Sequence, residues 1–255
     1  MALRLNNLRI NAVFRMRLSM INLFHFCNNW LEKVILLEQN CVLCGCSNDQ
    51  QICQDCYHSL ISHDNNNHCP RCLIQLAPKE LHCANCHENN FQFERVISAF
   101  EYGFPLDKIL HQLKYNHKIE YTTLLSQLFW SQIARQIQRL PEVIIPVPLH
   151  PKKHKLRGFN QVHELLREFR QLNPQVQLIQ AQRTKETQAQ ATLNRQQRLS
   201  NLSNAFSIQA DLRGKSIAIV DDVVTSGTTV NELAKLCQQL GAAHVEIWCL
   251  MRAQH

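Results

Sequence analysis

The chain has 255 residues, which is enough for one α/β domain and a smaller module. Hydrophobic residues make up 45% of it and no apolar run reaches the roughly 18 residues that span a bilayer, so we expect neither a largely disordered chain nor a transmembrane segment. The net charge of +7 is uneven, because residues 150–198 hold ten Lys and Arg against three Asp and Glu. This excess favours a phosphate-rich partner there over an ordinary solvated face.

Twelve cysteines are many for this length, and the N-terminus lacks the apolar centre and small-residue cleavage site of a secretory signal peptide. Cysteine-rich chains without an export signal are more often metal-binding than disulfide-bonded, because cytosolic thiols stay reduced. The sequence therefore predicts a cytoplasmic metal-binding protein.

Residues 1–40 predict an N-terminal extension that ends in a helix over residues 23–37. The first nineteen residues are basic with interleaved apolar positions, which is typical of an amphipathic helix at a membrane or a partner. The alternative, which we favour, is that translation starts at Met20 and that these residues are not part of the working protein.

Residues 41–90 hold four Cys-x-x-Cys pairs in a row and predict a small zinc ribbon module. Two such pairs complete a tetrahedral four-thiolate zinc site, and a module this small has too little core to fold without metal. Sequential pairing would give two structural Zn²⁺ ions. Interleaved pairing with one or two ions, an iron–sulfur cluster and substitution by a spare residue such as Cys46 are open alternatives. The predicted metal ligands are Cys41, Cys44, Cys53, Cys56, Cys69, Cys72, Cys83 and Cys86.

The third segment, residues 91–255, predicts an α/β domain with a parallel sheet. Residues 91–102 alternate between apolar and polar side chains, which is typical of a strand. Pro105 begins a helix, and a longer amphipathic helix covers residues 122–140. Further strands are expected at residues 143–147, 175–180, 217–220 and 244–251.

A basic loop leaves the carboxyl end of the 143–147 strand and leads into a helix from about Asn160. Several cations next to a helix N-terminus can hold a diphosphate and its Mg²⁺. The cations are Lys152, Lys153, Lys155 and Arg157.

Residues 183–206 form a long polar connection. Such a segment is typical of a lid over a binding site, although a disordered surface loop has the same composition.

Residues 216–229 are the most informative stretch. An apolar strand precedes Asp221-Asp222, and a hydroxyl-rich turn around Gly227 then leads into an amphipathic helix. Backbone N–H groups at such a helix N-terminus bind anions, and glycine lets the backbone come close. Two carboxylates beside an anion site make sense if they accept hydrogen bonds from sugar hydroxyls. These residues predict a sugar 5-phosphate ligand at the carboxyl edge of a parallel sheet.

The stretch resembles the phosphoribosyl-diphosphate (PRPP) binding motif of type I phosphoribosyltransferases. Other motifs precede it in a fixed order: the four Cys-x-x-Cys pairs (called knuckles below), Pro146-Val147-Pro148, Arg157-Gly158-Phe159-Asn160-Gln161 and Thr187-x-x-Gln190. Over roughly residues 22–252 this order resembles the ComF/GntX-like family, in which a double zinc ribbon precedes a phosphoribosyltransferase-like domain. Relatives often have arginine where Lys155 stands, which weakens any role carried over to that residue.

The resemblance implies a type I phosphoribosyltransferase fold with PRPP and Mg²⁺ as ligands. It also implies handling of incoming single-stranded DNA in the cytoplasm during natural transformation, with DNA-uptake helicases or recombination proteins as candidate partners. It assigns catalytic roles to Asp221, Asp222, Lys155 and Arg157, and lid roles to Thr187, Gln190, Arg195 and Arg198. It assigns PRPP contacts to Asp221, Asp222, Val223, Val224, Thr225, Ser226, Gly227, Thr228, Thr229, Lys152 and Lys153.

Several functions compete for these motifs. A PRPP-binding protein that handles DNA is the one we favour, and an active phosphoribosyltransferase in nucleotide or base salvage, with an acceptor that the sequence does not identify, is the alternative. A glutamine amidotransferase is disfavoured because Ala2 rather than cysteine follows Met1. A purely structural zinc adaptor leaves the PRPP motif unexplained. Aromatic residues are sparse in residues 150–198, so we expect DNA binding there to be driven by the backbone and sensitive to salt.

Overall fold

The structure is a computed structural model, and it describes residues 39–61, 67–77, 80, 83–116, 118–149, 152, 155, 157–183 and 205–254. It divides into two compact units, residues 1–60 and 61–255. The expected N-terminal helix over residues 23–37 lies outside the described residues. The boundary that the sequence places after residue 90 is a different division of the chain and stays a prediction.

The first unit holds the first two cysteine knuckles. A short antiparallel pair, β1 (Gln39–Asn40) and β2 (Ser47–Asn48), closes a turn around the first knuckle. The helix α2 (Gln54–Ile61) begins within the second knuckle.

The second unit opens with the remaining two knuckles and repeats this plan. An isolated antiparallel bridge between His68 and Gln75 closes the third knuckle, and the short helix α3 (Ala84–Asn89) begins at the fourth.

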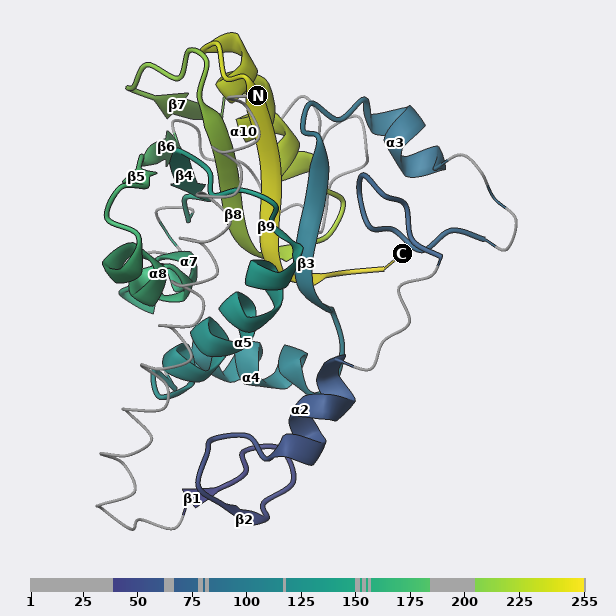
Figure 1. Cartoon of the computed structure of the whole chain (residues 1–255), viewed down its shortest axis with the longest axis vertical. Helices are drawn as coiled ribbons and strands as arrows, with labels where there is room; N and C mark the ends of the chain where they lie inside the picture. Colours follow the sequence, from purple (N-terminus) through teal and green to yellow (C-terminus); the bar gives the residue numbers. More distant parts are fainter. Residues whose placement is uncertain are drawn as a thin grey trace, which may run out of the picture. The chain divides into compact units, whose positions relative to one another are not determined.

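A five-stranded parallel sheet forms the centre of the second unit (Figure 1). Its spatial order is β3-β9-β8-β4-β5, and every neighbouring pair is parallel. The predicted parallel α/β domain is thus confirmed. The strands are β3 (Arg95–Glu101), β4 (Val143–Pro146), β5 (Gln177–Leu178), β8 (Ser216–Val224) and β9 (His244–Arg252).

Between β4 and β8 the side of the sheet on which the chain adds its next strand changes. After β4 the chain continues to β5 on the outer side, whereas after β8 it continues to β9 on the other side. Loops that leave the carboxyl ends of two such strands diverge and leave a crevice for a ligand. Both predicted anion-binding loops leave the sheet at this point.

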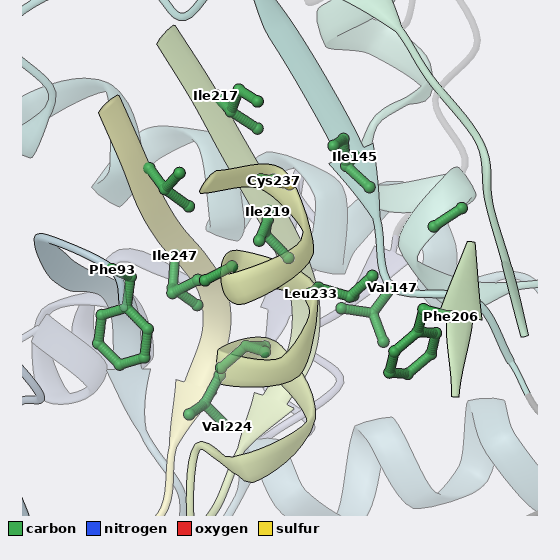
Figure 2. Packing of buried hydrophobic residues seen from close by; sticks show 14 of the residues in the cluster. Phe93, Ile145, Val147, Phe206, Ile217, Ile219, Val224, Leu233, Cys237 and Ile247 are labelled. Atoms are coloured by element: carbon green, nitrogen blue, oxygen red, sulfur yellow. The ribbon is translucent and has the colours of Figure 1, made fainter. Parts of the chain in front are cut away.

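Helices cover the two faces of the sheet. On one face α10 (Thr228–Gln239) packs Leu233 and Cys237 against Ile217, Ile219 and their neighbours (Figure 2). On the other face α5 (Tyr121–Gln136) lies against β3 and β9, and its Trp130 meets Trp248 edge to face at 6.0 Å. The remaining elements are α4 (Leu106–Tyr115), α7 (Gln161–Leu165), α8 (Arg167–Leu172) and the antiparallel hairpin of β6 (Ala181–Arg183) and β7 (Phe206–Ile208).

Several boundaries differ from the sequence expectations. The strand expected over residues 91–102 begins only at Arg95, because Arg71 takes the carbonyls of Phe91 and Phe93 that a strand would use in its ladder. The helix expected over residues 122–140 ends at Gln136. The helix expected from Asn160 is broken at Leu166 into α7 and α8.

The largest difference concerns β8, which runs to Val224 instead of ending at Val220. Val223 and Val224 still pair with β9, so the two aspartates lie within the strand and not after it. β4 in contrast ends at Pro146, opposite Val220. The part of β8 that carries the aspartates therefore extends beyond the end of β4.

The part of the chain that the structure describes contains no helix that is both long and apolar enough to cross a membrane.

Candidate functional site

The β8–α10 loop, defined here as residues 225–227, has the shape of an anion site. Gly227 adopts a left-handed conformation with φ of 79°, and no side chain caps α10 there. The hydroxyls of Ser226 and Thr228 lie 2.8 Å apart at the entrance to the helix. The amides of the first helical turn and these hydroxyls are the donors that a phosphate group would use.

Glycine is required at position 227 for two reasons. A side chain is strained at this φ, and a Cβ atom would lie 3.2 Å and 3.3 Å from two ring atoms of Phe91. The loop is therefore tightly packed from behind while Thr225 stays exposed at its front.

The two predicted aspartates differ in their surroundings. Asp222 is buried, and its Oδ2 lies 2.7 Å from Nζ of Lys114. Asp221 is half-buried, and its Oδ1 accepts a hydrogen bond of 2.8 Å from the Asp222 amide. An ammonium group thus compensates one of the two carboxylates, which lowers the repulsion that this pair would exert on a nearby phosphate.

The predicted roles of the valines in this stretch find less support in the geometry. Val224 is buried in the core, and its carbonyl accepts hydrogen bonds from Arg252 and from the Ala253 amide. Val223 is half-buried between the aspartates and the loop.

The loop after β4 supplies a second group of polar residues. Arg157 is buried, and its guanidinium lies over the ring of Tyr115, 5.1 Å from the ring centre. Asn160 caps α7 by accepting from the Val162 amide, and it also donates to the Val147 carbonyl. Lys152 and Lys155 are exposed, and Lys153 lies outside the described residues.

The next residue, Gln161, is 1% exposed, and neither polar atom of its side-chain amide has a hydrogen-bond partner among the residues that the structure describes. A buried amide without partners is unfavourable by about 1–3 kcal/mol. Such a group is typical of a site where a water molecule or a ligand completes the hydrogen bonds.

Lys114 and Tyr115 were not among the predicted site residues. They end α4, whose apolar residues at helical spacing, Leu106, Ile109, Leu110 and Leu113, are all buried. A lysine and a tyrosine at the end of a complete apolar face were the only local signal. Their partners Asp222 and Arg157 are distant in sequence, so the pattern within the helix could not reveal them.

The predicted lid residues Thr187, Gln190, Arg195 and Arg198 lie outside the described residues. The two chain segments that flank them are held together. Arg183 of β6 pairs with Phe206 of β7, and its guanidinium lies 5.7 Å from the centre of that ring. The two ends of the segment therefore meet in one hairpin.

The cysteines gather in two clusters with the same backbone plan. In each, the first cysteine donates its amide to the carbonyl five residues later, Cys46 in the first cluster and Ile74 in the second. In each, the second pair of cysteines begins a short helix. Knuckles therefore pair in sequence order. The first cluster comprises Cys41, Cys44, Cys46, Cys53 and Cys56, and the second Cys69, Cys72, Cys83 and Cys86.

The sulfur positions fit a tetrahedral metal ion. With metal–sulfur bonds of about 2.3 Å, tetrahedral thiolates are roughly 3.8 Å apart. The Cys44 and Cys53 sulfurs are 3.8 Å apart, and the pairs Cys69–Cys86 and Cys72–Cys83 are 3.6 Å and 3.5 Å apart. Both clusters can therefore hold a metal ion.

Hydrogen bonds prepare some of these thiols for metal binding. Burial tends to raise the pKa of Cys41, but amide donors from Cys44, Cys53 and Leu43 outweigh it and lower the pKa to about 6. Burial also tends to raise the pKa of Cys72. Hydrogen bonds outweigh this effect, that from the Asn85 side chain first, so that the pKa is lowered. A thiolate is the form that binds metal, so both residues favour the bound state.

The first cluster offers two candidates for its fourth ligand. The sulfur of Cys46 lies within 4.8 Å of those of Cys41, Cys44 and Cys53. The Cys56 thiol interacts with the same three cysteines, which together with burial raise its pKa. The repeated plan places Cys56 where the second cluster has Cys86, and Cys46 where it has Ile74. Cys56 therefore stays our predicted ligand.

We expect about two Zn²⁺ per chain by elemental analysis, at four thiolates for each ion. The variant Cys56→Ser should lose about one ion on dialysis against a chelator, because three thiolates hold zinc less tightly. Cys46→Ser is its matched control and should keep both ions. The opposite result would make Cys46 the ligand.

Comparison with known proteins agrees with this geometry. A family model described as "Phosphoribosyl transferase domain" matches residues 157–255. The DNA utilization protein YhgH of Shigella flexneri is 37% identical over 189 residues, which cover 72% of this chain and 83% of that protein. Competence protein F of Haemophilus influenzae is 31% identical over 211 residues, covering 79% and 90%. Competence protein ComFC of Streptococcus pneumoniae is 26% identical over 209 residues, covering 81% and 90%.

Proposed function

This chain belongs to the ComF-like family, and on that premise we propose that it binds PRPP, together with Mg²⁺, at the crevice between β4 and β8. The observation that carries the proposal is the extension of β8 beyond β4. The two aspartates and the β8–α10 loop thereby lie at the edge of the sheet from which the chain leaves β4 toward the basic loop, and this supports one shared site. The match of residues 157–255, which include both aspartates and the β8–α10 loop, to a phosphoribosyltransferase domain supports the same ligand.

The proposed roles follow from the chemistry of each group. Amides and hydroxyls of the β8–α10 loop bind the 5-phosphate, and Asp221 and Asp222 accept hydrogen bonds from the ribose hydroxyls. Arg157, with Lys152, Lys153 and Lys155, faces the diphosphate and its Mg²⁺. The zinc assigned to the two cysteine clusters is structural.

We extend the proposal to the handling of single-stranded DNA in the cytoplasm during natural transformation. The support is the names of the relatives, which refer to DNA utilization and to competence, and the positive charge of residues 150–198. Exposed lysines such as Lys152 and Lys155 suit phosphate contacts that carry no sequence information. Helicases or recombination proteins of DNA uptake are the protein partners that such a role would require.

Catalysis by the same site is the second candidate. An active transferase in nucleotide or base salvage needs an acceptor pocket beside C1 of PRPP. A hollow of about 330 Å³ instead lies among Gln177, Gln180, Ala210 and their neighbours, next to the edge strand β5. β4 separates that strand from β8, and the residues that line the hollow include none of the candidate site residues.

The proposal is tested by calorimetric titration of the zinc-loaded protein with PRPP and Mg²⁺. We expect Asp221→Asn/Asp222→Asn to weaken PRPP binding by about 100-fold or more, because two charge-assisted hydrogen bonds to the ribose are worth roughly 3 kcal/mol. Glu232→Gln, which removes a carboxylate on the second turn of α10, is the control and should bind normally. Equal affinity of the double variant would refute the assignment.

Repeating the titration with a short single-stranded oligonucleotide tests the extension to DNA. We expect the oligonucleotide to bind with an affinity that falls steeply as salt rises, and to compete with PRPP at the basic loop. An oligonucleotide that does not bind at low salt would remove DNA from the proposal and leave PRPP binding in place.

A further inference from the structure

The second cysteine cluster is built into the same core as the β8–α10 loop. Cys69 and Cys72 are buried in one hydrophobic cluster with Phe91, Phe93 and Val224, the last residue of β8. Figure 2 shows Phe93 and Val224 in this cluster, beside α10. The metal-binding residues and the strand that ends in the loop therefore share one packed interior.

Arg252 connects the two directly. This last residue of β9 is 1% exposed, and its Nε donates to the Cys72 carbonyl at 2.7 Å. Its Nη1 donates to the Val224 carbonyl at 2.9 Å and also to the carbonyl of Thr225, the first residue of the loop. One planar guanidinium thus joins the backbone of a metal ligand to the backbone at which the loop begins.

A second connection runs through Arg71, which lies inside the third knuckle. Its Nε donates to the Phe93 carbonyl at 3.0 Å, and its Nη2 donates to the Phe91 carbonyl. The ring of Phe91 then lies behind Gly227 at the centre of the loop. The knuckle therefore supports both the start and the middle of the loop.

We propose that the second cysteine cluster, with its ion bound, positions the β8–α10 loop for ligand binding, and that Arg252 and Arg71 are the positioning residues. The affinity of the loop for a sugar phosphate then depends on metal occupancy of the second cluster, an effect that rests on the proposed function. The order of the loop itself depends on that occupancy whether or not PRPP is the ligand.

The reason is that a bound ion holds the four thiols of the second cluster together and so fixes the knuckle that Arg252 and Arg71 join to the loop. Four thiols within 4.8 Å of one another stay together when they bind an ion, and a metal-binding turn this short loses its fold without one. Once the turn opens, the Cys72 carbonyl and the Arg71 side chain leave their places, and the loop loses its support. The first cluster lies in the other compact unit.

The first experiment compares two full-length variants that each lose one ion, Cys83→Ser/Cys86→Ser and Cys44→Ser/Cys53→Ser. Hydrogen–deuterium exchange of residues 223–230 is measured without ligand, and PRPP affinity is measured by calorimetry. In the second-cluster variant we expect exchange about tenfold faster and affinity about tenfold weaker, since only about a tenth of the molecules then hold a competent loop. The first-cluster variant should stay within about twofold of the parent in both measurements. Equal exchange in the two variants would overturn the proposal.

Arg252→Lys keeps both metal sites and covers the case in which the cysteine variant does not fold. We expect it to retain its zinc but to show faster exchange in residues 223–230, because a single ammonium group cannot join three carbonyls on two segments. Arg213→Lys, at an exposed arginine paired with Asp211, is the matched control and should exchange normally. Unchanged exchange in Arg252→Lys refutes the link. Altered exchange in a protein that binds no PRPP would retain the link and refute the proposed function instead.

Discussion

Replacing Gly227 by alanine should abolish most PRPP binding while the protein still folds. The residue has φ of 79°, and alanine in this region costs about 1–2 kcal/mol. Its Cβ would also lie 3.2 Å from the Phe91 ring, so the loop or the ring has to move. A displacement of the loop amides by a few tenths of an ångström lengthens several phosphate hydrogen bonds together. We expect affinity to fall by about 30-fold or more, equivalent to roughly 2 kcal/mol, by calorimetry.

Gly214→Ala separates the two causes. Gly214 has φ of 70°, and a Cβ there would have nothing within 4 Å. This variant should lose about 1–2 kcal/mol of unfolding free energy from backbone strain alone. Its PRPP affinity should equal that of the parent, because it lies in the turn before β8. If the two variants bind PRPP equally well, the β8–α10 loop does not contact the phosphate.

Local pattern was sufficient for most of the fold. The apolar residues at 106, 109, 110 and 113 recur at helical spacing, and all four are buried in α4. The continuous apolar run from Ile217 to Val220 is buried on both faces, as a central parallel strand requires. These elements were predictable because their burial follows from the local order of apolar residues alone.

Strand ends were less predictable, because they depend on partners elsewhere in the chain. Aspartate is rare within strands, so the sequence indicated that β8 ends before Asp221. β8 nevertheless continues past both aspartates, because Val223 and Val224 pair with Met251 and Arg252 of β9. The strand was expected to continue back to Phe91, but the donor that prevents it is Arg71, a residue of the cysteine module.

The polar contacts of the site could be predicted only in part. The order of acidic pair, hydroxyls and glycine indicated the anion site without any knowledge of the fold. The Lys114–Asp222 pair joins residues more than a hundred positions apart in sequence, and Arg252 donates to carbonyls that are 180 and 28 positions away from it. Nothing in the local sequence of either partner identifies the other, and only the sheet topology brings them together.

Replacing Lys114 by methionine should destabilise the protein strongly, because it leaves the Asp222 carboxylate buried without a counter-charge. The side chains of this pair are 17% and 12% exposed, and their charged atoms are 2.7 Å apart. Removal of one partner from a buried pair costs about 3–5 kcal/mol, and we expect roughly the lower end of that range here because both groups keep some solvent contact. Urea unfolding of the zinc-loaded protein measures the loss.

The double variant Lys114→Met/Asp222→Asn identifies the cause of this loss. Removing both charges should restore most of the lost stability, since a neutral buried amide has a smaller desolvation penalty than an unpaired carboxylate. Lys118→Met is the matched control, because Lys118 pairs with Glu120 at 3.3 Å while both side chains are more than half exposed. An exposed pair contributes about 0–1 kcal/mol, so this variant should unfold almost as the parent does. If Lys114→Met loses no more than Lys118→Met, Asp222 is solvated in the free protein, and the ion pair contributes little to holding α4 against the strand that carries the aspartates.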